Sequence, residues 1–283
     1  MDFLDLLSKE AVVYICRGFE NYLGNNTYTV GWLYEKGSFV KCSKIIKPYS
    51  VFDKSVKTIF PNSNEKNVLN TSAFKALLSN KWEVYKTLTR YFPETLLVSN
   101  NNELMQVTNI FNSKDVLVVK PLDGMKGHGI GFFEGNDIEG IKCHIESYPG
   151  HNFILQRFIE TSKGIKGITN RRHDLRLVCI NNKVVWSHVR MPQGNELKAN
   201  VAGGGNIEDV DLILLPKLAL EIVEAISSVF SEKYNNPMFS VDFGFEDNKP
   251  YIFELNDQTI GFPRPEMKTK NRFLNELVIR LTA

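Results

Sequence analysis

The alternation of apolar and polar residues is clearest between Met238 and Gly261, where it predicts a β-hairpin. In the runs MFSVDFGF and YIFELN the apolar residues fall mainly on odd positions. Side chains of a strand alternate between two faces, so each run has one buried face and one polar face. The patterns agree if odd positions pair with odd positions. We therefore expect a three-residue loop over 247–249 that places Asp242 opposite Glu254.

The polar face of this hairpin gathers oxygen ligands. Asn256 lies two residues beyond Glu254, so the two side chains share a face, with Cα atoms roughly 7 Å apart. Together with Asp242 they supply two carboxylates and an amide oxygen. This set suits Mg²⁺, which proteins hold through one or two carboxylates and substrate phosphates. From the pattern alone, a solvent-facing hairpin with ordinary surface charges is an equally good interpretation.

The bulk properties narrow the class of protein. The chain has 283 residues, 43% of them hydrophobic and 23% charged, which is typical of a soluble protein with two or three subdomains. Its net charge of +2 gives no reason to expect a nucleic acid or a membrane as partner. The N-terminus is acidic where a signal peptide is basic, and the four cysteines contain no CxxC pair. We expect a cytoplasmic protein with reduced thiols.

The first half of the chain combines strand candidates with two features that suit phosphate binding. Residues 1–75 read as a small α/β unit, which by elimination is expected to help bind a non-nucleotide substrate. A helix capped by Ser79 or Asn80 then begins with Lys81 in its first turn. The strand VLVVKP ends with Lys120 and leads into a loop rich in glycines, whose backbone N–H groups can approach anionic oxygens. The loop glycines are Gly124, Gly127, Gly129 and Gly131.

The second half predicts paired strands and two further helices. A helix capped by Asn136 precedes the apolar strand NFILQRFIE, and a basic segment at 162–172 follows. HDLRLVCI and KVVWSHVR read as paired strands, with Asp174 and Arg176 on one face. Next come a second glycine-rich loop over 194–205 and the longest helix, predicted over 211–231.

The order of these parts resembles the ATP-grasp superfamily, most closely its ribosomal-protein-modifying and peptide-forming carboxylate–amine ligases. The motifs that carry the resemblance are NK at a helix start, VVKP, the glycine loop, LQRFIE, DLR, K-A-N and D…ELN, over roughly residues 78–261. The resemblance implies an α/β (α+β) fold with three subdomains, at 1–77, 78–155 and 156–283. ATP would lie between the second and the third.

The resemblance also implies a role for each matching residue. The ATP phosphates would be contacted by Lys81, Lys120 and the loop glycines Gly124, Gly127 and Gly129, and the adenine by the hinge residues Gln156, Arg157, Phe158 and Ile159. Asp174 would lie by the ribose, whereas Lys198 and Asn200 would reach the triphosphate and the metal. Asp242, Glu254 and Asn256 would hold one or two Mg²⁺ ions, with Mn²⁺ as an alternative.

The implied reaction joins a small-molecule or peptide carboxylate to an amine through an acyl phosphate, with release of ADP and phosphate. Its catalytic residues would be Arg176, Arg190 and Lys198, which supply positive charge to the γ-phosphate and the tetrahedral intermediate. A phosphotransferase and a non-catalytic nucleotide-binding module stay open as alternatives, and so does a homo-oligomer. Ser240, Arg157, the segment 257–261 and the basic 162–172 insert depart from the family pattern, and these departures leave the substrate undetermined.

Overall fold

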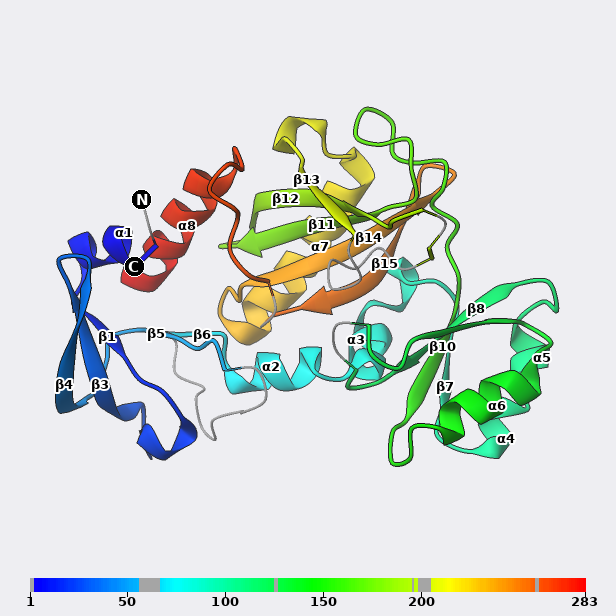
Figure 1. Ribbon diagram of the computed structural model, residues 1–283, viewed down its shortest axis with the longest axis horizontal. Coiled ribbons are helices and arrows are strands. Elements are labelled where there is room, and N and C mark those ends of the chain that lie inside the picture. The colour runs from blue at the N-terminus through cyan, green and yellow to red at the C-terminus, as the bar shows by residue number, and fades with distance from the viewer. Residues whose placement is uncertain (1–2, 56–66, 125–126, 195, 198–204, 258–259) are drawn as a thin grey trace.

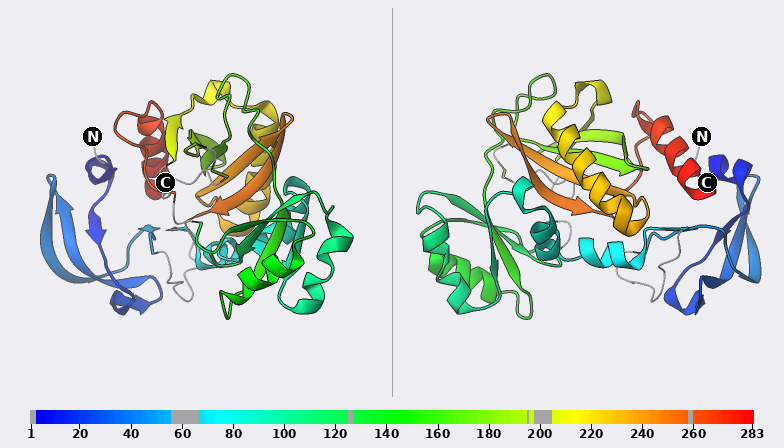
Figure 2. Two further views of the ribbon diagram at one scale, coloured as in Figure 1. Left: turned by 45° about the vertical axis from the view of Figure 1, so that its right-hand side comes forward. Right: turned by 180° about the vertical axis from the view of Figure 1, so that it is seen from behind.

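Three groups of strands organise the chain in the computed structural model, which describes residues 3–55, 67–124, 127–194, 196–197, 205–257 and 260–283 (Figure 1). The sheet nearest the N-terminus is antiparallel, and its strand β3 (Thr27–Glu35) pairs with all three others. These are β1 (Val13–Ile15), β2 (Tyr22–Gly24) and β4 (Ser38–Ile46). Helix α1 (Phe3–Glu10) precedes this sheet and packs against the C-terminal helix α8 (Lys270–Thr282), so the two ends of the chain lie side by side (Figures 1 and 2).

A short connection links this sheet to the rest of the chain. The 3-10 turn η1 (Phe19–Asn21) precedes β2, and the parallel pair β5 (Val51–Phe52) and β6 (Val68–Leu69) leads into helix α2 (Ser72–Leu78). Phe74 of α2 is fully buried against Phe230 and Phe239 of the C-terminal part. Helix α2 therefore anchors the N-terminal segment on the C-terminal core.

The central sheet has the order β7-β10-β8-β9 and is antiparallel throughout. Its strands are β7 (Thr95–Val98), β8 (Val116–Pro121), β9 (Gly131–Glu134) and β10 (Phe153–Arg157). The helical elements here are α3 (Lys81–Leu88), η2 (Thr89–Tyr91), α4 (Asn101–Leu104), α5 (Val107–Ile110) and α6 (Ile138–Glu146). The expected boundary between residues 155 and 156 falls inside β10, and the three-subdomain division stays a prediction.

Two helix starts show which capping predictions were right. Asn80 caps α3, because its side chain accepts from the backbone N–H groups of Trp82 and Glu83. Helix α6 is capped by Asp137, whose carboxylate accepts from Gly140 N–H, so the prediction of Asn136 was wrong by one residue. Both residue types cap helices well, and the sequence alone does not choose between neighbours.

The C-terminal sheet carries the predicted hairpin and has the order β13-β12-β11-β14-β15. Its strands are β11 (Asp174–Ile180), β12 (Lys183–Met191), β13 (Asn206–Asp209), β14 (Phe239–Glu246) and β15 (Lys249–Asn256). Helix α7 (Lys217–Tyr234) covers one face (Figure 2). It starts later than expected, because the 3-10 turn η4 (Leu212–Leu214) and Pro216 precede it.

The hairpin pairs as expected at its open end and differently at its turn. Asp242 lies opposite Glu254. The loop has two residues, Asp247 and Asn248, with φ angles of 50° and 66°, and the prediction of a three-residue loop was wrong. Phe253 forms a bulge between the pairs Asp242–Glu254 and Phe243–Ile252. This extra residue in β15 compensates for the shorter loop, so Asp242 still lies opposite Glu254. Because of this bulge the fully buried residue is Ile252, whereas Tyr251 and Phe253 are only half-buried.

None of the helices in the described ranges combines the length and the apolar composition needed to cross a membrane.

Candidate nucleotide and metal site

Two lysines from the central sheet region approach the hairpin of the C-terminal sheet. Lys120 Nζ, at the end of β8, donates to Gln156 Oε1 at 2.6 Å and to the Phe253 carbonyl at 3.4 Å. Lys81 Nζ, in the first turn of α3, donates to the Gly124 carbonyl at 2.6 Å and lies 3.5 Å from Glu254 Oε1. The residues expected to bind phosphate and metal thus meet where the central and C-terminal sheets adjoin.

Lys81, which is expected to contact the ATP phosphates, lies between the glycine loop and the C-terminal hairpin. The Lys81 ammonium joins the glycine loop to Glu254, and its side chain is only 16% exposed. Burial lowers the pKa of Lys120 to about 8, the nearby Glu254 carboxylate opposes this shift and the Lys81 ammonium adds to it. The carboxylates of Asp174 and Asp242 also act on Lys120, but both are paired with arginines, so the two ammonium groups favour an anionic ligand.

The glycine loop is held against the end of β8. Gly127 and Gly129 have φ angles of 76° and 72°, a conformation that non-glycine residues rarely adopt. A Cβ on Gly129 would come within 2.6 Å of Pro121 Cγ, so the close approach to Pro121 also requires glycine. Residues 125 and 126 lie outside the described residues. A phosphate contact by the loop stays a prediction.

The charged face of the C-terminal sheet is a row of side chains from four strands. His188, Arg176, Asp242 and Glu254 lie directly opposite one another on β12, β11, β14 and β15. Residues that are opposite across a ladder point to the same face, so these four side chains line one surface. Asp174 and Arg190 form the next pair along β11 and β12. Helix α7 covers the other face, which is apolar.

Asp242 is held by two arginines. Arg176 donates through Nε to Oδ1 and through an NH2 group to Oδ2, both at 2.6 Å, and Arg190 donates to Oδ2 at 2.7 Å. Burial alone would raise the pKa of Asp242, but the charges of Arg176 and Arg190 outweigh burial and hold the pKa well below its usual range. The carboxylate is therefore ionised, as a metal ligand must be.

The neighbouring groups complete this network. Arg190 also forms an ion pair with Asp174, whose pKa burial raises to about 7. Burial, with the charges of Arg176 and Arg190, lowers the pKa of His188 to about 3, so its ring is neutral. Arg190 Nε and Asp174 Oδ1 are buried and have no hydrogen-bond partner among the described residues. These two atoms are a donor and an acceptor that a ligand could use.

The hinge residues differ in what they offer to a nucleotide. Gln156 is buried and bridges Lys120 to Thr95 Oγ1, to which its amide donates at 3.0 Å. The backbone N–H of Arg157 donates to Glu94 and that of Phe158 to Val116, so neither amide is available to adenine. Ile159 is buried. An adenine contact through the Ile159 amide or the Arg157 carbonyl stays a prediction.

The Arg157 side chain forms a clamp that the sequence did not predict. Its guanidinium donates to both carboxylate oxygens of Glu246, at 3.2 and 2.9 Å, and lies over the Tyr251 ring. Glu246 also accepts from the Glu160 backbone N–H at 2.9 Å. These contacts join β10 to the tip of the β14–β15 hairpin, 89 residues away in the chain.

The metal-binding prediction can be tested against the donor set. Asp242 and Glu254 face each other and Asn256 follows on β15, so two carboxylates and an amide share one surface. Asp242 Oδ1 accepts a single hydrogen bond in the described network, whereas a carboxylate oxygen accepts about two, so a lone pair remains. These residues fit Mg²⁺ with phosphate oxygens in its remaining positions. Within the described ranges, neither this site nor any other place gathers three or more His, Cys, Asp and Glu side chains that could hold a metal ion, so the set depends on the Asn256 amide and on phosphate oxygens. Lys198 and Asn200 lie outside the described residues.

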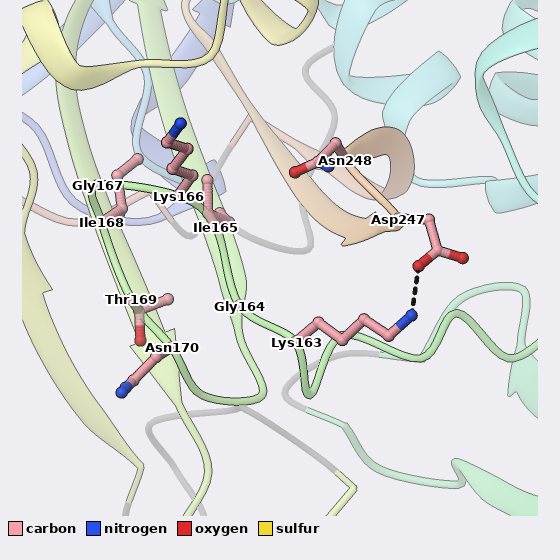
Figure 3. A pocket seen from close by; sticks show the side chains of 10 residues that line it. All are labelled: Lys163, Gly164, Ile165, Lys166, Gly167, Ile168, Thr169, Asn170, Asp247 and Asn248. Carbon is pink, nitrogen blue, oxygen red and sulfur yellow. Dashed lines mark hydrogen bonds and ion pairs between the residues drawn. The ribbon is translucent and has the colours of Figure 1, made fainter.

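A separate hollow of about 580 Å³ opens between the basic insert and the hairpin tip (Figure 3). It is lined by residues 163–170 together with Asp247 and Asn248, and Lys163 Nζ donates to Asp247 Oδ1 at 2.6 Å. None of the residues expected to bind ATP or metal lines this hollow. The insert is therefore an addition at the far end of the hairpin from Asp242 and Glu254.

The two sheets, with a glycine loop on one and the facing carboxylates Asp242 and Glu254 on the other, are arranged as in an ATP-grasp fold. The family model described as prokaryotic glutathione synthetase, ATP-grasp domain, matches residues 81–234, more than half of the chain. The chain belongs to this family. This confirms the ATP-grasp superfamily and the α+β fold class expected from the sequence.

Three similar proteins show how much of the chain is shared and at what sequence identity. Glutathione synthetase of Buchnera aphidicola is 26% identical over 152 residues, which are 52% of this chain and 44% of that protein. A protein named probable alpha-L-glutamate ligase, from Vibrio vulnificus, is 30% identical over 142 residues, 50% of this chain and 42% of that protein. The D-cycloserine synthetase DcsG has a similar fold, with a TM-score of 0.56 over 76% of this chain and 74% of its own, at 14% identity. The chain spans less than half the length of the first two relatives.

Proposed function

We propose that the chain is an ATP-dependent ligase that joins a carboxylate to an amine through an acyl phosphate, with an amino acid or a peptide as substrate. The observation that carries this proposal is the meeting of Lys81 and Lys120 with the facing carboxylates Asp242 and Glu254. Membership of the ATP-grasp family supports it, as do relatives named for glutathione synthetase and alpha-L-glutamate ligase.

Each charged group has a task in this reaction. Attack of a carboxylate on the γ-phosphate brings two anions together, so their charge must be neutralised. Lys120 and Lys81 bind the phosphate oxygens, and Mg²⁺, held by Asp242, Glu254 and Asn256, supplies further positive charge when bound. Arg190 Nε, which has no hydrogen-bond partner among the described residues, donates to an oxygen of the γ-phosphate or of the tetrahedral intermediate.

The bond changes follow from this arrangement. A carboxylate oxygen of the substrate attacks the γ-phosphorus, and the bond to ADP breaks. The amine then attacks the acyl carbon and loses a proton, and phosphate leaves as the amide forms. Arg176 keeps Asp242 ionised throughout, because its two hydrogen bonds need the carboxylate form. The catalytic tasks of Lys198 and the triphosphate contact of Asn200 belong to the same proposal.

A cytoplasmic location belongs to the same proposal. The four cysteines, Cys16, Cys42, Cys143 and Cys179, are free thiols, which is compatible with a reducing compartment. We propose small-molecule or peptide carboxylates and amines as partners. A homo-oligomer stays an untested prediction.

The proposal is tested by calorimetric titration of ATP with and without Mg²⁺. Wild type should bind ATP more tightly with Mg²⁺, and Glu254→Ala should lose this dependence because it removes one of two carboxylate ligands. Glu208→Ala is the matched control, since Glu208 is an exposed glutamate on β13 of the same sheet. Wild type that binds no ATP, or a Glu254→Ala variant that binds like wild type, would contradict the site.

Product analysis then separates the possible reactions. A ligase supplied with amino acids, L-glutamate first, should release ADP and free phosphate in equal amounts. A phosphotransferase would release ADP but retain the phosphate in a phosphoester. A non-catalytic module would bind ATP and release neither product.

A further inference from the structure

A cavity of about 1080 Å³ is lined by residues of the N-terminal sheet, α1 and α8. These elements lie on the opposite side of α2 from the central sheet (Figure 1). The lining of the cavity is mostly apolar and includes Phe3, Val30, Phe52, Phe262 and Leu274. The ring of Phe3 contacts those of Phe52 and Phe262, at centroid distances of 5.9 and 5.4 Å. Its volume is close to that of pockets that bind drug-sized ligands, and none of the residues assigned to ATP or metal lines it.

Two strand edges border this cavity. Residues 11–18, which include β1, line it on one side, and residues 50–55, which include β5, line it on another. Among the described strands β1 pairs only with β3, so its other edge is open. The N–H groups of Val51 and Asp53 donate to Asn67 and Leu69 of the β6 segment, both at 2.9 Å. Successive residues of a strand point their N–H and C=O groups to opposite sides, so the backbone groups of Phe52 point away from β6.

The side chains that line the cavity carry more positive than negative charge. Three cations line it, Arg17, Lys54 and Lys270, against the single carboxylate of Asp53. That carboxylate is already neutralised, because the buried Lys75 ammonium lies 2.6 Å from Asp53 Oδ2. Lys54 Nζ lies over the Phe52 ring, 5.5 Å from its centroid, so a cation is placed against the apolar floor.

The charged end of the cavity adjoins the metal site. Asp257 directly follows the expected metal ligand Asn256 and is 9% exposed. The charges of Lys54, Lys75 and Asp53 all act on the Asp257 carboxylate, so these four residues form one charged cluster. A ligand that fills the cavity and reaches Lys54 would therefore end close to the end of β15.

We propose that this cavity binds an extended apolar peptide that carries a carboxylate, by strand addition to β1 or β5, and that this peptide is a substrate of the ligase. The substrate role of the peptide rests on the proposed function, whereas its binding in the cavity does not. Apolar side chains fill the aromatic floor, Lys54 binds the carboxylate, and an open strand edge pairs with the peptide backbone. A fatty acid shares the apolar chain and the carboxylate, but it leaves the strand edges unpaired.

The test measures binding without ATP or Mg²⁺, so it does not depend on ligase activity. The probes are the N-acetylated tetrapeptide valyl-leucyl-valyl-phenylalanine as free acid, the same peptide as its C-terminal amide, and decanoate. The wild type should bind the acid roughly tenfold more tightly than the amide, because a hydrogen bond between charged groups is lost. Decanoate should bind more weakly than the peptide acid.

Matched variants locate the binding site. Lys54→Met should abolish the preference for acid over amide. Lys44→Met removes the same charge from an exposed position on β4 outside the cavity, and it should keep that preference. Thermal unfolding checks that both variants fold. If Lys54→Met is unfolded, the acid and amide comparison on wild type still decides the question.

A backbone-modified probe tests strand addition itself. Methylation of the central amide nitrogen removes one N–H donor, and it should weaken binding of the peptide acid about tenfold. Three results would overturn the proposal: no binding of the peptide acid, equal binding of acid and amide, or tighter binding of decanoate. If the peptide acid binds but no ADP is released with it, the cavity binds peptides and the assignment of this peptide as a substrate fails, whereas the ligase proposal is decided separately by ADP release with amino acids.

Discussion

The two faces of the C-terminal sheet are held together in different ways. On the face toward α7, Leu177 and Val241 are fully buried among other apolar side chains. On the other face Asp242 is only 2% exposed, and three hydrogen bonds from two arginines surround it. Apolar packing is non-directional and tolerates changes of similar volume, whereas a buried charge network depends on every partner. The first face therefore stabilises the fold, and the second supplies fixed charges for chemistry.

The largest expected effect comes from breaking the charged face at its centre. Asp242→Asn should lower the free energy of unfolding by about 3–5 kcal/mol, because Arg176 and Arg190 lose the charge that compensates their burial. Chemical denaturation measures this change. On the apolar face, Phe243→Leu should cost only about 1–1.5 kcal/mol, since the change keeps an apolar side chain in a packed site.

A double variant tests whether Asp242→Asn destabilises the protein because it leaves a buried guanidinium without its carboxylate. Asp242→Asn combined with Arg176→Met removes one carboxylate and one guanidinium together, and it should be more stable than Asp242→Asn alone. If the effects of the two single substitutions simply add, Arg176 and Asp242 are not coupled, and the account of this face is wrong.

The next effect concerns the lysine that faces the charged surface. Lys120→Met should weaken ATP binding about ten- to hundredfold, because it removes a charge-assisted hydrogen bond to phosphate. Calorimetric titration measures the affinity. Lys114→Met, in an exposed position before β8, is the control and should leave the affinity unchanged. Unchanged affinity in Lys120→Met would place the phosphates elsewhere.

The same lysine predicts a pH dependence. Burial lowers the pKa of Lys120 to about 8, so the ammonium is present below pH 8 and is lost as the pH rises above it. ATP affinity of the wild type should therefore fall between pH 7 and pH 9, by roughly tenfold. Lys120→Arg stays charged over this range, and its affinity should change much less. Parallel pH curves for the two proteins would show that Lys120 is not the titrating group.

The sequence predicted those parts of the site that depend on local periodicity. Alternation alone placed Asp242 opposite Glu254, because a side-chain period of two ties position to face. The alternation gave the wrong loop length, because a bulge at Phe253 shifts the register by one residue within β15. Bulges are set by contacts with neighbouring strands, and no residue type in YIFELN marks one.

The partners of the arginines could not be predicted in this way. Arg176 and Asp242 are 66 residues apart, and their contact depends on how β11 pairs with β14. A similar limit applies to Gln156. A lone glutamine in an apolar strand signals a buried polar partner, but only the pairing of β10 with β8 and β7 identifies Lys120 and Thr95.

The smallest expected effect tests the clamp that joins β10 to the hairpin tip. Arg157 and Glu246 are about a quarter exposed, at 28% and 24%, so solvent screens their ion pair. Arg157→Met keeps the packing on Tyr251 and should cost only about 1 kcal/mol of unfolding free energy. ATP affinity should stay within about twofold of wild type if adenine contacts the backbone of the hinge and not this side chain.

The control is Glu246→Gln, which weakens the same ion pair from the hairpin side and should match Arg157→Met in stability and in affinity. A tenfold loss of affinity in Arg157→Met alone would instead mean that the guanidinium itself contacts the nucleotide, and the charged face would then extend to the hinge.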